Sequence, residues 1–89
     1  MEQEHAQVLS RAGNCAVVHL PGRAFPGVHV QGDTFAVLRK RLAKAARALR
    51  EGPGDVEALD ELDQVVEEIG VMVGLYEQVL SQRGIRRPY

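Results

Sequence analysis

A chain of 89 residues can bury one hydrophobic core, and its formal net charge of −1 excludes the chain-wide positive field that attracts nucleic acid or an anionic membrane. The single cysteine, Cys15, excludes an intrachain disulfide and favours a reducing compartment. We therefore expect one domain over residues 1–89, located in the cytoplasm and without a membrane segment, because the longest uncharged stretch, Ile69–Tyr76, is far below the ~20 apolar residues that a bilayer requires.

The first third of the chain, residues 1–32, predicts three short antiparallel strands: Glu4–Leu9, Cys15–Leu20 and Val28–Gln31. Gly13-Asn14 joins the first two strands, since this dipeptide suits a tight hairpin turn. Residues 21–27 contain two prolines, which lack the amide hydrogen that a sheet needs. We expect this segment to be an exposed loop.

Two amphipathic helices are predicted next, a basic one over residues 33–51 and an acidic one over residues 55–83. Asp33 or Thr34 can cap the first helix, and Gly52-Pro53 ends it. Its apolar face is Phe35, Leu38, Leu42, Ala45, Ala46 and Leu49. The face of the second helix alternates spacings of three and four: Leu59, Leu62, Val66, Ile69, Val73, Tyr76 and Leu80. The predicted fold class is α+β, with three short antiparallel strands followed by an antiparallel helical hairpin.

The middle of the second helix admits a second interpretation. Residues 69–76 contain Gly70 and Gly74, which weaken a helix and can mark a kink or the close approach of another backbone. A strand through residues 71–73 is the alternative. The unbroken heptad spacing favours the helix.

Opposite charges separate onto the two helices. In an antiparallel hairpin, Arg39 and Arg41 fall near Glu67 and Glu68, and Lys44 and Arg47 fall near Asp60 and Asp63. Lys40, Lys44 and Arg47 point away from the apolar face and form a candidate phosphate-binding stripe. A nucleic-acid-binding regulator is therefore one alternative function. We do not expect nucleic acid as the partner, because acidic residues adjoin the stripe and no aromatic residues interleave with it.

The second helix is longer than the first and overhangs it. Residues past about Met72 have no partner on the first helix. They either cover the sheet or form a homodimer interface: Val73, Tyr76, Val79 and Leu80.

Histidine and cysteine give a second alternative, a small enzyme or metal-binding protein. Strand alternation places Cys15 and His19 on one face, and His29 lies on the third strand. A structural zinc site usually has four ligands in close pairs, and a nucleophile needs an orienting acid. We expect no metal site, no cofactor and no catalytic residue.

The proline-rich loop is the predicted partner-binding feature. Arg23 is a forked cation next to the aromatic Phe25, and two prolines reduce the cost of ordering the loop. The alternative is that Phe25 packs into the core.

The segment that enters the first helix resembles a known family. Pro26-Gly27, three residues, Gln31-Gly32-Asp33-Thr34 and a following Ala-rich helix resemble the strand-to-helix junction of HicB-like antitoxins. The whole chain, including Arg87-Pro88-Tyr89, also resembles short bacterial proteins of unknown function. The resemblance implies a non-enzymatic protein-interaction module with an antitoxin- or immunity-type role, in which a small protein neutralises a partner protein.

Overall fold

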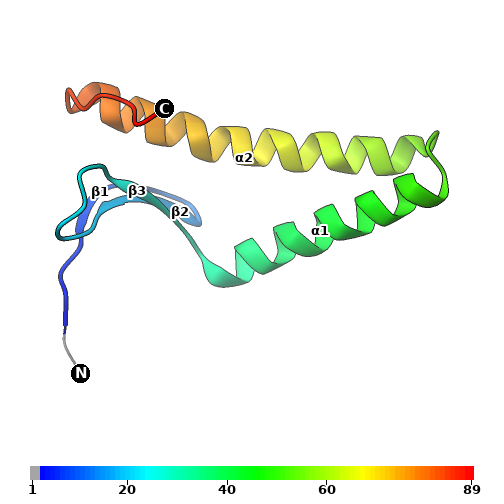
Figure 1. Ribbon diagram of the computed structural model, residues 1–89, viewed down its shortest axis with the longest axis horizontal. Helices are drawn as coiled ribbons and strands as arrows, with labels where there is room; N and C mark the ends of the chain where they lie inside the picture. Colours follow the sequence, from blue (N-terminus) through cyan, green and yellow to red (C-terminus); the bar gives the residue numbers. More distant parts are fainter. Residues whose placement is uncertain (1–2) are drawn as a thin grey trace. The chain divides into compact units, whose positions relative to one another are not determined.

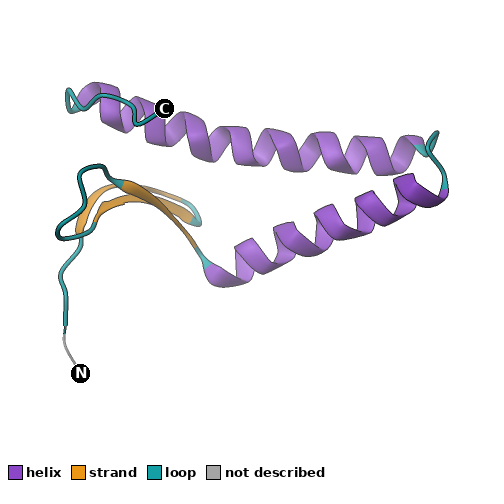
Figure 2. Ribbon diagram, in the orientation of Figure 1, coloured by secondary structure: helices purple, strands orange, loops and turns teal. Residues whose placement is uncertain are grey.

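The computed structural model describes residues 3–89. The elements in chain order are β1 (Gln7–Ala12), β2 (Cys15–His19), β3 (Gly27–Val30), α1 (Gly32–Glu51) and α2 (Val56–Gln82). Figures 1 and 2 show the three strands followed by the two helices, which confirms the predicted α+β class. The chain divides into two compact units. The sheet unit contains the strands and Met72–Tyr89, and the hairpin unit is Gly32–Val71.

The sheet has the order β1-β2-β3, and both strand pairs are antiparallel. Ala12 pairs with Cys15, so Gly13-Asn14 is the two-residue turn that the sequence predicts. Gly13 has a φ of 58°, a left-handed conformation that glycine adopts at little cost. The prediction for the first strand was wrong by three residues at each end, because the pairing continues up to the turn and leaves residues 4–6 outside the sheet.

The core of the sheet unit lies on one face of the sheet. Val17 of β2 is fully buried against the last part of α2, where Tyr76, Val79 and Leu80 are the contacting side chains. Three partly buried side chains complete this cluster: Leu9, Leu75 and Ile85. A bulge between Val8 and Ser10 accompanies the placement of Leu9 against the core. The last turns of α2 therefore cover the sheet.

The end of α2 is closed by a Schellman motif. The Ile85 amide donates to the Leu80 carbonyl at 2.8 Å, and the Gly84 amide donates to the Ser81 carbonyl at 3.2 Å. Gly84 provides the left-handed residue that the motif requires, with a φ of 67°. Ile85 packs on the core that contains Leu80, which is the apolar contact typical of this cap.

The C-terminal tail folds back on α2 through Glu77. Arg87 Nη1 lies 2.9 Å from Glu77 Oε2, and the Tyr89 hydroxyl donates to the same oxygen at 3.2 Å. Desolvation, and then the hydrogen bond to Glu77, raise the pKa of Tyr89.

The hairpin unit begins with α1 and turns sharply after Glu51. The Gly52 amide donates to the Ala48 carbonyl at 2.8 Å, which confirms that Gly52-Pro53 ends the helix. Asp55 Oδ1 accepts the Ala58 amide at 3.0 Å, so Asp55 is the N-cap of α2.

Helix α2 is continuous through its glycines. Its backbone is helical from Val56 to Gln82, so the alternative strand at residues 71–73 is wrong. A methyl group placed on Gly70 or Gly74 would meet no atom within 4 Å apart from the adjacent residues and the backbone of its own helix. No other backbone in the described part of the chain therefore approaches these glycines closely.

Candidate functional site

The loop between β2 and β3 is tied down near both ends. The Arg23 amide donates to the Leu20 carbonyl at 3.4 Å across Pro21-Gly22, and Gly22 has the positive φ of 75° that a type II turn needs. At the other end, the Tyr76 hydroxyl donates to the buried Pro26 carbonyl at 2.7 Å. The loop is an ordered surface carried by the sheet unit.

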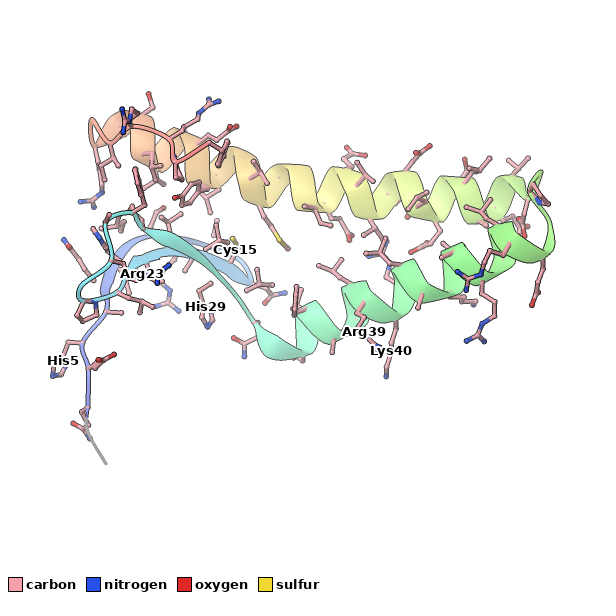
Figure 3. All side chains as sticks on the ribbon, in the orientation of Figure 1. His5, Cys15, Arg23, His29, Arg39 and Lys40 are labelled. Atoms are coloured by element: carbon pink, nitrogen blue, oxygen red, sulfur yellow. The ribbon has the colours of Figure 1, made fainter. Side chains whose placement is uncertain are left out.

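Within this loop the two predicted recognition residues differ in exposure. Arg23 is exposed, and its carbonyl accepts the His19 Nε2 hydrogen at 2.7 Å. Phe25 is half-buried, so it is neither a fully exposed recognition residue nor a fully buried core residue, the two alternatives that the sequence left open. Figure 3 labels Arg23, which belongs to the segment that joins β2 and β3. A partner can reach the Arg23 guanidinium.

The histidines and the cysteine are not gathered into a reactive site. Ala16 pairs with His29, whereas Val30 pairs with Cys15, so His29 and Cys15 project from opposite faces of the sheet (Figure 3). Burial raises the pKa of the Cys15 thiol, which lowers its thiolate fraction at neutral pH. Among residues 3–89, no cluster of three His, Cys, Asp or Glu side chains could hold a metal ion.

The two helices of the hairpin unit are linked through one arginine. Arg41 Nε donates to Glu61 Oε1, and Arg41 Nη1 donates to Glu68 Oε2 at 2.5 Å. The hydrogen bonds to Glu61 and then to Glu68 raise the pKa of the Arg41 guanidinium. The predicted proximity of Arg41 and Glu68 is confirmed, and it shows that the two helices run antiparallel.

The other predicted cationic residues of α1 remain on its surface. Lys40, Lys44 and Arg47 are exposed, and none of them forms an ion pair with an acidic group within the described residues. Figure 3 shows Lys40 extending on the side of α1 away from α2, and Arg39 near it. The predicted pairs of Arg39, Lys44 and Arg47 with α2 are not formed.

A groove of about 440 Å³ opens near the turn of the hairpin unit. Its charged lining consists of Arg41 and Lys44 together with Asp55, Glu57 and Glu61, and three alanines complete the lining. Two basic and three acidic side chains line the groove, so their fields largely cancel and the groove does not select strongly for an anion or a cation.

The residues predicted as a dimer interface occupy two environments. Tyr76, Val79 and Leu80 are buried in the core of the sheet unit, so they are not available as a surface, and the sheet-covering alternative is the one that the structure shows. Val73 remains exposed. The physical reason is that a three-stranded sheet needs one face covered, and these side chains cover it.

The buried side of α2 differs from the apolar face that the sequence spacing predicted. In its first half the buried residues are Ala58 and Val65, whereas Leu59, Val66 and Ile69 from the predicted apolar face are exposed. On α1, Leu38 and Ala45 are buried as predicted, but Phe35 is exposed. The hairpin unit thus carries an exposed apolar surface made of residues that the sequence spacing predicted to be interior. The signal for it was present, because Val65, Met72 and Val79 make the apolar face wider than one heptad row.

These features define a small α+β protein with an ordered loop on its sheet unit and an apolar surface on its helical hairpin. The chain belongs to a family of unknown function (DUF6959), whose profile matches residues 1–89. No curated protein matches the chain, and no solved structure matches it. Within the described residues, neither helix combines the length and the apolar content needed to cross a bilayer.

Proposed function

We propose that this chain is a small non-enzymatic protein-interaction module. The observation that carries the proposal is the exposure of large apolar side chains on the hairpin unit, including Phe35, Leu59, Val66 and Ile69. Contiguous apolar surface on a small domain typically marks a protein interface, because water contact with it is unfavourable. Scattered single residues would carry no such meaning, whereas these recur along two neighbouring helices.

The antitoxin- or immunity-type form of this role rests on the HicB-like segment. In that segment, β3 ends at Val30 and α1 begins at Gly32, with Asp33 Oδ1 accepting the Thr34 amide at 2.9 Å. The segment supports a role in which the protein neutralises a partner protein. A reducing cytoplasm suits a module with one unpaired cysteine.

The loop is a second contact surface of the module, carried by its sheet unit. The bond from Tyr76 to Pro26 holds its base, so the exposed Arg23 binds with little further ordering cost. Arg23→Ala is expected to weaken capture of the partner without changing thermal stability. If Phe25→Ala lowers stability by about 3 kcal/mol or more, Phe25 is a core residue and is not part of the recognition surface.

Pull-down from the native host with mass-spectrometric identification tests the proposal. The tagged wild-type chain is compared with Val66→Asp and with Val71→Asp, a control on the same helix that is 70% exposed against 61% for Val66. Circular dichroism confirms that all three are folded. We expect a protein, either another copy of the chain or a different one, to be retained by the wild type and the control and lost from Val66→Asp. Retention of no protein, or equal retention by both variants, would contradict the proposal.

A nucleic-acid regulator is the second candidate, favoured by one observation. Lys40, Lys44 and Arg47 are exposed on α1 and unpaired in the described part of the chain. The acidic α2 opposes this use, so we expect only weak, nonspecific affinity. Titration with duplex and single-stranded oligonucleotides at two salt concentrations decides between the candidates. Submicromolar, sequence-selective binding at physiological salt would favour the regulator.

A further inference from the structure

Each helix of the hairpin unit carries an apolar row next to its buried side. Successive residues of a helix turn by about 100°, so residues seven apart lie almost in line. On α1 the row lies beside buried Leu38 and Ala45, and on α2 it lies beside buried Ala58 and Val65. The rows consist of Phe35, Leu42, Ala46 and Leu49 on α1, and of Leu59, Leu62, Val66 and Ile69 on α2. Phe35 is 66% exposed and Val66 is 61% exposed.

The two rows lie on the same side of the hairpin, as the ion pairs of Arg41 show. Arg41 contacts both Glu61 and Glu68, so these three residues mark one side of the helix pair. On each helix, the apolar row is rotated away from the buried residues in the direction opposite to these charged groups. The rows therefore form one two-helix apolar face, which we call the open face.

The charges of the hairpin unit show what partner fits the open face. The α1 helix carries six basic residues, whereas the part of α2 within the unit carries six acidic residues and no basic one. In the described chain, Arg41 is the one basic residue of α1 that pairs with an acid. At the border of the open face these charges are represented by Arg39 on α1 and Asp63 on α2, so a partner that presents negative charge to α1 and positive charge to α2 fits it. A second copy of the hairpin does both at once.

We propose that the open faces of two copies pack together as a symmetric four-helix bundle, with α1 of one copy against α2 of the other. This inference rests on the proposed interaction role and names the molecule that occupies the open face. A two-fold axis parallel to the helices gives the arrangement, and it repeats every contact twice. Arg39 borders the row on α1 and Asp63 borders the row on α2, so opposite charges flank the apolar contact. The other face-to-face arrangement places α1 against α1 and brings like charges together.

The open face approaches the size of a standard dimer interface. The sixteen residues of α2 in the unit, from Val56 to Val71, span about 24 Å, and two adjacent helices with side chains are about 20 Å across. The flat footprint is of the order of 500 Å², before side-chain relief adds accessible area. Stable interfaces of standard size bury about 800 Å² on each partner, so the footprint and this requirement are of the same order.

Sedimentation equilibrium of the full chain, from low to high micromolar concentration, tests the dimer. We expect the wild type to be a dimer and Val66→Asp to raise the dimer dissociation constant by about two orders of magnitude, because the symmetric interface would bury two unpaired carboxylates. Val71→Asp lies on the opposite side of α2 and should leave the constant unchanged within about threefold. Phe35→Asp and its control Val37→Asp repeat the comparison on α1, so the test does not depend on the folding of one variant.

Charge reversal tests the orientation of the two copies. Arg39→Glu should weaken the dimer if α1 faces α2 of the other copy, and Lys44→Glu, on the Arg41 side, should not. A tighter dimer for Arg39→Glu would overturn the proposed orientation. A wild-type monomer at all concentrations, or a dimer equally tolerant of Val66→Asp and Val71→Asp, would overturn the second copy as partner. If the wild type is a monomer but the pull-down captures a different protein through Val66, the interaction role stands and only the dimer is refuted. If the wild type is a monomer and the pull-down captures no protein, both proposals are refuted.

Discussion

The hydroxyl of Tyr76 provides a direct test of the core of the sheet unit. It donates a 2.7 Å hydrogen bond to the carbonyl of Pro26, and both residues are buried. Tyr76→Phe keeps the aromatic ring and removes only the donor. The buried carbonyl is then left without its partner, which in proteins typically costs about 1–3 kcal/mol.

This cost is large for a chain of this length. At about 0.05–0.15 kcal/mol per residue, the whole chain has a stability of roughly 4–13 kcal/mol. A loss of about 2 kcal/mol lowers the melting temperature by about 8–16 °C in a domain of this size. Urea unfolding followed by circular dichroism, with a thermal melt at the same protein concentration, measures both quantities.

Tyr89→Phe is the matched control. The Tyr89 hydroxyl also makes one hydrogen bond, to Glu77 at 3.2 Å, but the side chain is 70% exposed and water replaces the partner. We expect its unfolding midpoint to match that of the wild type. If Tyr76→Phe were equally neutral, the hydroxyl would not satisfy the Pro26 carbonyl and the anchoring of the loop by α2 would be refuted.

Three further predictions concern the helix ends and the buried thiol. Gly84→Ala should lower the free energy of unfolding by about 1–2 kcal/mol, because Gly84 has a φ of 67°. Gly74→Ala should raise the free energy of unfolding by up to about 1 kcal/mol, because Gly74 lies in a helix with open space around it. The urea midpoints of the two variants should therefore shift in opposite directions, and shifts of the same sign would contradict the prediction. Asp55→Ala should cost about 1 kcal/mol by removing the acceptor for the Ala58 amide, while Asp55→Asn should cost little, as urea unfolding would show. The pKa of the Cys15 thiol is raised in the folded chain, so the contribution of the neutral thiol to stability is fully present below about pH 8.5 and is lost as the pH rises through the folded-state pKa. Thermal melts across this pH range should show a steeper fall of the melting temperature for the wild type than for Cys15→Ala.

Local signals in the sequence predicted the elements and their order. Gly52-Pro53 and Asp55 end one helix and begin the next through effects that act within four residues, and the structure places both boundaries there. The Gly13-Asn14 turn was likewise readable, because a positive φ at a two-residue turn favours glycine. The extent of β1 was not, since a strand's ends depend on where its partner pairs.

The predictions about the candidate site that were wrong or left open concern features that depend on tertiary structure. Sequence spacing cannot choose between Val65 and Val66 as the buried residue of α2, because they are adjacent, equally apolar and only about 100° apart on the helix. Strand alternation cannot place His29 relative to Cys15 until the register of β2 and β3 is known. The sequence alone determined which residues can form helices, strands and turns, since these depend on backbone sterics and local hydrogen bonds. The tertiary structure alone decided which apolar row is buried and which remains exposed for a partner, since burial depends on the surface that another element presents.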